Sequence, residues 1–174
     1  IGWESYPLSL RIVNWIKWSF NGNILKNHWM LSLEIQARFL SNNIEYHLLG
    51  NHIIANAKAL IFAGLFFQGK EANKWYRQGQ KLLKKEVSEQ ILSDGGNFEL
   101  STMYHSIFLE DMLDLVNIHR TYGHQIPKVL QEKIPLMLRW LEIMCHPDGK
   151  ISFFNDSAFG IASSFQELED YAER

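Results

Sequence analysis

The chain has 174 residues, 47% of them hydrophobic, and a formal net charge of -2, so it can bury the core of one domain. Its near-neutral charge provides no basic field for nucleic acid, and no nucleic-acid partner is expected. No apolar run reaches membrane-spanning length, so no membrane span is expected, and the single cysteine, Cys145, excludes an internal disulfide framework.

Helical patterning starts near the beginning of the chain. A first helix is expected over residues 3–20, with Pro7 in its opening turn, where proline is tolerated. Residues 21–23 contain the glycine and asparagines that stop it. A second helix is expected over 25–40, where apolar side chains recur at helical spacing.

The third expected helix begins near Ile53 and has the clearest period in the chain, with apolar residues one, three and four positions apart. Its small residues, among them Ala57, Ala63 and Gly64, suit an inner helix that is packed closely on both sides. Gly69 is expected to end it as a C-cap.

A fourth helix is expected from residue 71 to about residue 92, with its apolar face turned inward. The opposite face is basic, which is most simply explained as a solvated outer surface. That face consists of Lys74, Arg77, Lys81, Lys84 and Lys85. Residues 93–97 form a strong turn signal after it.

Two more helices follow. The fifth is expected to begin near Ser101, a good N-cap, and to end at residues 122–123. The sixth is expected over about 127–145, where Pro135 either kinks the helix or marks its true first turn.

These elements predict an all-α protein, because no segment alternates as a strand would. Residues 94–98 and 148–153 also form a faint repeat, 54 residues apart, and each follows a long helix. A period near 50 residues with two helices in each repeat indicates stacked antiparallel helical hairpins, closed into a ring or left as an arc.

Alternate helices of such an array point the same way. The third and fifth helices therefore begin on one rim, to which the loop after the sixth also returns. Three polar loops, residues 41–52, 93–104 and 146–160, are expected to converge there.

Two of these loops carry candidate site residues at a helix start. Asn51 and His52 lead into the third helix, and Tyr104 and His105 open the fifth. One full hairpin separates the pairs, so we expect them to share a cleft. Each also has an ordinary explanation: an N-cap for Asn51, a satisfied rim histidine for His52 and a core aromatic for Tyr104. Glu99 can simply favour the positive helix end.

Several runs resemble the heparinase II/III-like polysaccharide lyases. The central ones are residues 43–52 with 55–60, and residues 94–105. The resemblance continues in residues 3–15 and 109–115, and so covers most of the chain.

The resemblance implies an N-terminal α/α toroid of helical hairpins, followed by a β-sandwich domain with the substrate between them. Residues 1–174 are expected to form part of a single, incomplete α/α toroid domain, without the β-sandwich. Since the chain begins at Ile1 rather than Met, we expect it to be a processed or excised piece of a longer protein. The resemblance favours a bacterial protein that is periplasmic or secreted. The family also uses a histidine from beyond the toroid, so the piece alone should be poorly active.

The reaction implied is β-elimination at a uronic acid of an anionic polysaccharide or oligosaccharide. By resemblance Asn51 neutralises the sugar carboxylate, Tyr104 is the catalytic acid or base, and His52 is a second acid or base or a substrate ligand. An amide, a phenol and an imidazole suit these roles. Further substrate-binding candidates are Tyr46, Asn97, Glu99 and His105.

Other classes of protein stay open. No cofactor or metal is expected, because the seven histidines include no His-x-x-x-His pair. A glycoside hydrolase on an α/α toroid would need two carboxylates, for which Glu99 and Asp156 are the candidates. A non-catalytic glycan-binding or helical-repeat scaffold is the third possibility. For a lyase, alginate or a uronate-bearing capsule is at least as plausible a substrate as a sulfated glycosaminoglycan, because the lysines lie on an outer face.

Overall fold

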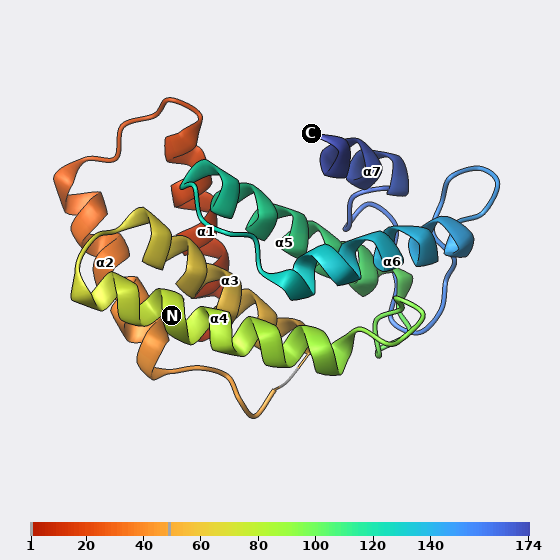
Figure 1. Ribbon diagram of the computed structural model, residues 1–174, viewed down its shortest axis with the longest axis horizontal. Helices are drawn as coiled ribbons and strands as arrows, with labels where there is room; N and C mark the ends of the chain where they lie inside the picture. The colour runs from red at the N-terminus through yellow and green to blue at the C-terminus, as the bar shows by residue number, and fades with distance from the viewer. Residues whose placement is uncertain (1, 49) are drawn as a thin grey trace. The chain divides into compact units, whose positions relative to one another are not determined.

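The computed structural model describes residues 2–48 and 50–174, so Leu49, inside the first run of the resemblance, lies outside the described residues. Among the described residues every regular element is a helix, and the only pairings of strand type are two isolated bridges. The all-α prediction is confirmed. The helices, shown in Figure 1, are α1 (Ser5–Phe20), α2 (Asn27–Asn42), α3 (Gly50–Phe66), α4 (Lys70–Gln90), α5 (Thr102–Thr121), α6 (Lys128–Met144) and α7 (Phe165–Glu173).

The chain divides into two compact units, Ile1–Glu86 and Val87–Arg174, and the boundary falls inside α4. Each unit has its own apolar core. In the first, α3 is buried almost throughout and packs on α1 and α2. In the second, α5 fills that place and packs on α6 and α7.

The small residues of α3 allow the first part of α4 to approach it closely. A Cβ added to Gly64 would lie 2.5 Å from the backbone nitrogen of Tyr76. One added to Gly79 would lie 2.8 Å from the carbonyl oxygen of Ala57. Neither Gly64 on α3 nor Gly79 on α4 has room for a methyl group, so each helix contributes one glycine to the close approach, and Gly64 confirms the expected slim inner helix.

The first unit is an up-and-down array. Tyr6 and His52, at the starts of α1 and α3, bring their ring centroids within 4.5 Å. Phe20 and Phe66, at the ends of the same helices, lie 6.3 Å apart. The helices α1 and α3 therefore run parallel, as expected of alternate helices. The helix α2, which lies between them in the sequence, runs in the opposite direction.

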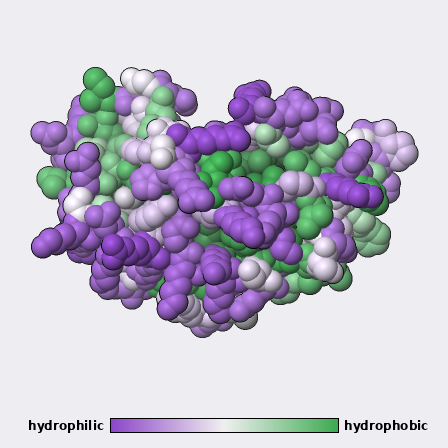
Figure 2. Space-filling model, in the orientation of Figure 1, coloured by the Kyte–Doolittle hydropathy of each residue, from purple (hydrophilic) through white to green (hydrophobic). Residues whose placement is uncertain are grey.

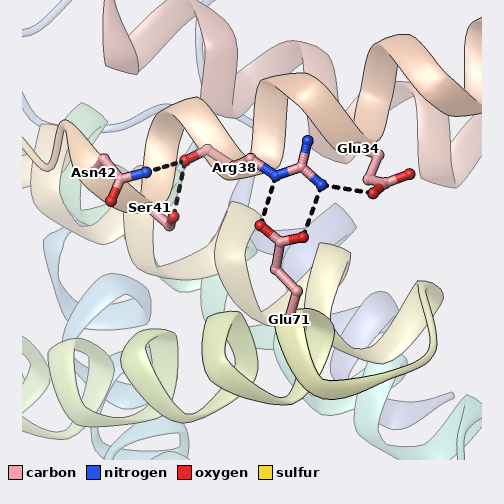
Figure 3. A network of polar contacts seen from close by, with 5 residues as sticks. All are labelled: Glu34, Arg38, Ser41, Asn42 and Glu71. Carbon is pink, nitrogen blue, oxygen red and sulfur yellow. Dashed lines mark hydrogen bonds and ion pairs between the residues drawn. The ribbon is translucent and has the colours of Figure 1, made fainter.

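Arg38 fastens α2 to α4 (Figure 3). Its guanidinium donates Nε to Glu71 Oε1 at 2.6 Å and one terminal nitrogen to Glu71 Oε2 at 2.7 Å. The same terminal nitrogen donates to Glu34 Oε1 at 2.7 Å. These bonds from Arg38 hold the pKa of the Glu71 carboxyl below its ordinary value. The bidentate geometry fixes how the two helices meet.

The basic face of α4 is exposed, as predicted. Each of its five lysine and arginine side chains is open to solvent. Hydrophilic residues predominate over α4 on the face drawn in Figure 2. Within the described part of the chain, no helix is both long and apolar enough to cross a membrane.

The second unit contains a helix, α7, that the periodicity does not predict. Its N-terminus is a capping box, in which Ser164 accepts from the Glu167 backbone and the Glu167 carboxylate accepts from Ser164. Leu168 is buried, and the Tyr171 hydroxyl donates to Asp114 Oδ1 on α5 at 2.8 Å. The Ser-x-x-Glu pattern was the available sequence signal.

Both expected ends of the third helix need correction, and the two interpretations of Pro135 can be decided. The helix α3 begins at Gly50, three residues before Ile53, so Asn51 lies inside its first turn rather than at its N-cap. It ends at Phe66, and Gly69, at φ +104°, instead begins the turn into α4, where its carbonyl accepts from Asn73. The helix α6 begins at Lys128 and ends at Met144, as expected, so Pro135 lies inside the helix and does not mark its first turn. The N-cap at Ser101 is confirmed, since its hydroxyl accepts from the Tyr104 backbone at 3.2 Å.

The faint repeat corresponds to one local structure built twice, over residues 90–98 and 144–152. In each copy the chain leaves a helix, turns through Asp-Gly with the glycine at positive φ, and pairs back on the helix end. The matching bonds are Leu92 N to Gly96 O (2.9 Å) with His146 N to Lys150 O (2.8 Å), and Phe98 N to Gln90 O (2.8 Å) with Ser152 N to Met144 O (3.1 Å).

Candidate functional site

Asn51 and His52 lie in the first turn of α3, in the first unit. Both side chains are half-buried. Among the described residues the Asn51 side chain makes no hydrogen bond. A free amide at a helix start can bind a carboxylate, together with the exposed N–H groups of the turn.

His52 is held by a ring and by a carboxylate. One face stacks at a tilt of 34° on Tyr6. Its Nδ1 atom is enclosed and lies 3.4 Å from Glu45 Oε2, without hydrogen-bond geometry. The side chain is still 42% exposed, so its solvent-facing edge lies away from Nδ1. Such a contact can tighten when substrate binds.

Asn56, fully buried in α3, holds Glu45 in place. Its Oδ1 accepts from the Glu45 backbone at 3.0 Å, and its Nδ2 donates to Glu45 Oε2 at 3.2 Å. The same Nδ2 donates to Ser9 Oγ at 3.1 Å, which ties the group to α1. We call Tyr6, Glu45, His52 and Asn56 the His52 cluster.

Tyr104 lies in the first turn of α5, in the second unit. Its hydroxyl donates to Asp156 Oδ2 at 3.3 Å. The hydroxyl of Ser101 donates to the Asp156 carbonyl at 2.7 Å, and that of Thr102 to the Ser152 carbonyl at 2.5 Å. The loops before α5 and after α6 therefore meet, as predicted for these two of the three polar loops.

Glu99 lies beside this pair. Burial and the negative charge of Asp156 raise the pKa of the Glu99 carboxyl. Its backbone carbonyl accepts from Asn155 Nδ2 at 2.7 Å. We call Glu99, Tyr104 and Asp156 the Tyr104 cluster. It combines a phenol with two neighbouring carboxylates, and the pKa of the Glu99 carboxyl is raised, which is a composition that acid–base sites use.

His105 lies beneath this cluster and is fully buried. The backbone N–H of Asn97 donates to its Nδ1 at 3.3 Å, so Nε2 carries the proton and donates to the Met137 carbonyl at 3.0 Å. Burial lowers the pKa of His105 to about 4. Its ring also stacks on Trp140 at 4.5 Å. Both nitrogens are engaged inside the protein, so His105 anchors the loop before α5. Contact with substrate stays a prediction that this burial disfavours.

The two remaining candidates have opposite exposures. Tyr46 is 59% exposed and free to meet a large ligand. Asn97 is fully buried; its Oδ1 accepts from the Glu99 backbone at 2.9 Å, which shapes the loop. The side-chain nitrogen of Asn97 is enclosed without a hydrogen-bond partner among the described residues.

The predicted residues thus form two clusters, one in each unit. Asn51, His52 and Tyr46 belong to the first unit, and Tyr104 and Glu99 to the second. The expected cleft shared by Asn51 and Tyr104 stays a prediction. Within the described ranges, no three potential metal-ligating side chains converge.

Sequence reasoning missed the residues that support the candidates. Tyr6, Glu45 and Asn56 hold His52, and Asp156, considered only for a hydrolase, holds Tyr104. One signal was available: Asn56 is a polar residue in the middle of an apolar helix, and such a residue is buried only with hydrogen-bond partners.

Comparison with known proteins assigns the chain to a class and then to a family. Its helical fold is that of heparinase III: a solved structure of that enzyme matches with a TM-score of 0.80 at 23% identity, over 95% of this chain and 27% of the other. Residues 16–173 match the family described as Heparinase II/III N-terminus. The chain belongs to this family, as the resemblance implied, and the match fits the expected incomplete α/α toroid.

The curated relatives are heparin-sulfate lyases. One from Bacteroides stercoris is 31% identical over 115 residues, which is 64% of this chain and 17% of that protein. One from Pedobacter heparinus is 30% identical over 129 residues, or 70% of this chain and 19% of that protein. The chain therefore spans about a fifth of the length of these relatives.

Proposed function

We propose that the protein containing this chain is a polysaccharide lyase that cleaves uronic-acid-containing polysaccharide by β-elimination. The observation that carries the proposal is the hydrogen bond from the Tyr104 hydroxyl, at the start of α5, to the carboxylate of Asp156, in a chain of the heparinase II/III family. The curated relatives are heparin-sulfate lyases, so heparan sulfate is the first substrate to test.

In the proposed reaction a base removes the proton from C5 of the uronate, the bond from C4 to the glycosidic oxygen breaks, and a C4–C5 double bond forms. The departing oxygen takes a proton from an acid. The amide of Asn51 donates to the sugar carboxylate and so stabilises the charge that develops when C5 loses its proton.

Tyr104 and His52 share the proton transfers. The Tyr104 hydroxyl, with Asp156 as its hydrogen-bond acceptor, reaches the proton at C5 or the leaving oxygen. The edge of His52 that faces away from Glu45 supplies the second group. A domain beyond this chain, such as the β-sandwich, supplies the rest of the cleft.

The test is to incubate the full-length protein with a panel of uronate polymers, with heparan sulfate and alginate among them, and to follow the ultraviolet absorbance of unsaturated uronates. A lyase gives rising absorbance together with new reducing ends. Tyr104→Phe should lose this activity and keep its fold. A wild-type protein that releases neither product would contradict the proposal.

A hydrolase is the second candidate, because Glu99 and Asp156 are neighbouring carboxylates and the first has a raised pKa. The same assay separates the two classes. New reducing ends without ultraviolet absorbance would identify hydrolysis.

A further inference from the structure

A tryptophan-lined pocket of about 500 Å³ opens in the first unit where α1 ends and α2 begins. Its volume falls in the range of small-ligand sites, which combine apolar walls with a few polar groups. The walls come from Asn14, Trp15, Trp18, Leu25 and Trp29. We call it the Trp pocket. None of its residues belongs to the His52 cluster or the Tyr104 cluster.

The three indole rings that line the pocket meet at large interplanar angles. Trp29 meets Trp15 with ring centroids 6.4 Å apart at 63°, and Trp18 with centroids 6.1 Å apart at 70°. Trp18 is 42% exposed although it is a large apolar side chain. A pyranose ring has C–H faces that match an indole and hydroxyls at its rim that match an amide such as Asn14. The lining therefore suits a sugar better than a wholly apolar ligand.

The pocket also lies in the basic part of the chain. Residues 5–33 contain Arg11, Lys17 and Lys26 and no Asp or Glu, whereas the whole chain has a net charge of -2. The Lys26 ammonium lies 5.2 Å from the ring centroid of Trp29, at the edge of the pocket. A local positive charge favours an anionic ligand over a neutral one.

We infer that the Trp pocket binds a hexuronate ring of the polysaccharide, with the ring against Trp18 and Trp29 and the carboxylate toward Lys26. The identity of the sugar rests on the proposed function; the pocket itself does not. Trp18 lies twelve positions after Tyr6 on α1, about 18 Å along the helix axis. The pocket is therefore at the other end of α1 from the His52 cluster, and it holds polymer without taking part in the reaction.

The experiment uses the full-length protein carrying Tyr104→Phe, so that the probe is not cleaved. The probe is a tetrasaccharide of alternating glucuronate and N-acetylglucosamine, and cellotetraose is its neutral counterpart. Tryptophan fluorescence is titrated with each. Trp18→Leu should weaken binding of the anionic probe about fivefold to tenfold, the value of one aromatic contact. Trp3→Leu is the matched control, because Trp3 is equally exposed and packs instead on Phe39.

Lys26→Gln tests the charge. Lys26→Gln should weaken binding of the anionic probe several-fold and leave binding of cellotetraose unchanged. Equal binding of the two probes, with no effect of Lys26→Gln, would overturn the assignment to an anionic ring. If wild-type protein cleaves uronate polymer but Trp18→Leu changes neither titration, the inference fails and the proposed function stands. If the probe binds through Trp18 and no polymer is cleaved, the pocket stands and the proposed function fails.

Discussion

The Tyr104 hydroxyl and the Asp156 carboxylate form a hydrogen bond of 3.3 Å that joins residues 52 positions apart. The contact connects the first turn of α5 to the loop after α6. It directs the phenolic hydrogen at a carboxylate, so Asp156 both orients the ring and offers a site for the proton. Because this bond joins two side chains, a substitution at Tyr104 tests the phenol without changing the bond from Ser101 that holds the loop after α6.

Tyr104→Phe should lower kcat on a cleaved uronate polymer by at least about a hundredfold, because a general acid or base is removed. Its fold should persist, because the Tyr104 backbone still donates to Ser101. Initial rates by ultraviolet absorbance and far-ultraviolet circular dichroism measure the two effects. A variant with near wild-type kcat would remove Tyr104 from the mechanism.

Replacing Asp156 should produce a graded series. Asp156→Asn keeps an oxygen that accepts from Tyr104 and should retain more activity than Asp156→Ala. Asp156→Asn should also lower the pKa of the Glu99 carboxyl, because a neighbouring negative charge is lost. Carbon-13 NMR of labelled Glu99 follows that titration. An unchanged titration would mean that burial alone raises the pKa of Glu99.

Glu45 is predicted to be a positioning residue for His52. Glu45→Gln keeps an oxygen for Asn56 Nδ2 and should retain most of the activity, whereas Glu45→Leu should lose about tenfold or more in kcat. Nitrogen-15 NMR of the His52 imidazole shows whether its tautomer changes in Glu45→Leu. A loss of activity with an unchanged His52 spectrum would indicate only a general structural effect.

His105 should make the chain sensitive to acid. Its pKa is about 4 in the folded chain and about 6.5 in an unfolded one, so between these values the unfolded state binds the extra proton. Stability therefore rises with pH through this window and is lost as pH falls through it, by at most about 3 kcal/mol. Urea unfolding of the 174-residue chain at a series of pH values measures the slope. His105→Gln should flatten it, and an equal slope in both proteins would assign the effect to other groups.

The repeated turn supplies a matched pair of glycine variants. Gly149, at φ +79°, has no atom within 4 Å of an added Cβ, so Gly149→Ala should cost only the strain of positive φ, about 1–2 kcal/mol. Gly95, at φ +96°, would place its Cβ 2.3 Å from the Leu136 carbonyl oxygen. Gly95→Ala should therefore cost about 1–3 kcal/mol more. Urea unfolding of both variants gives the difference, and equal costs would show that α6 shifts freely.

The sequence predicted six of the described helices because each has a long apolar period. It missed α7, which has nine residues and only Leu168 fully turned into the core, so its apolar period is too short to recognise. The sequence assigned Gly69 to the end of α3, but the residue lies at the start of α4. A glycine between two helices is compatible with the end of the first or the start of the second, and sequence alone does not distinguish them. The predicted start of α3, at Ile53, was three residues too late. The residues before it, Gly50, Asn51 and His52, are small or polar and lie outside the apolar period, although such residues also fit the first turn of a helix.

The candidate site was only partly predictable. The polar helix starts at Asn51 and Tyr104 are visible in the sequence, and their roles came from the family resemblance. The contacts of Glu45 with Asn56, and of Tyr104 with Asp156, join separate loops and helices, for which no local period exists. The burial of His105 depends in the same way on Met137 and Trp140, more than 30 positions away.

The paired turns at 90–98 and 144–152 are closed by matching backbone hydrogen bonds, and in each the aspartate carboxylate accepts from the backbone two residues on. Each one sets the direction in which the chain leaves a helix before the loop that follows. The loops after them, which carry Glu99 and Asp156, can therefore change sequence without moving the helices that support them. A scaffold of this kind keeps its helical register constant while the loops that it presents differ in sequence.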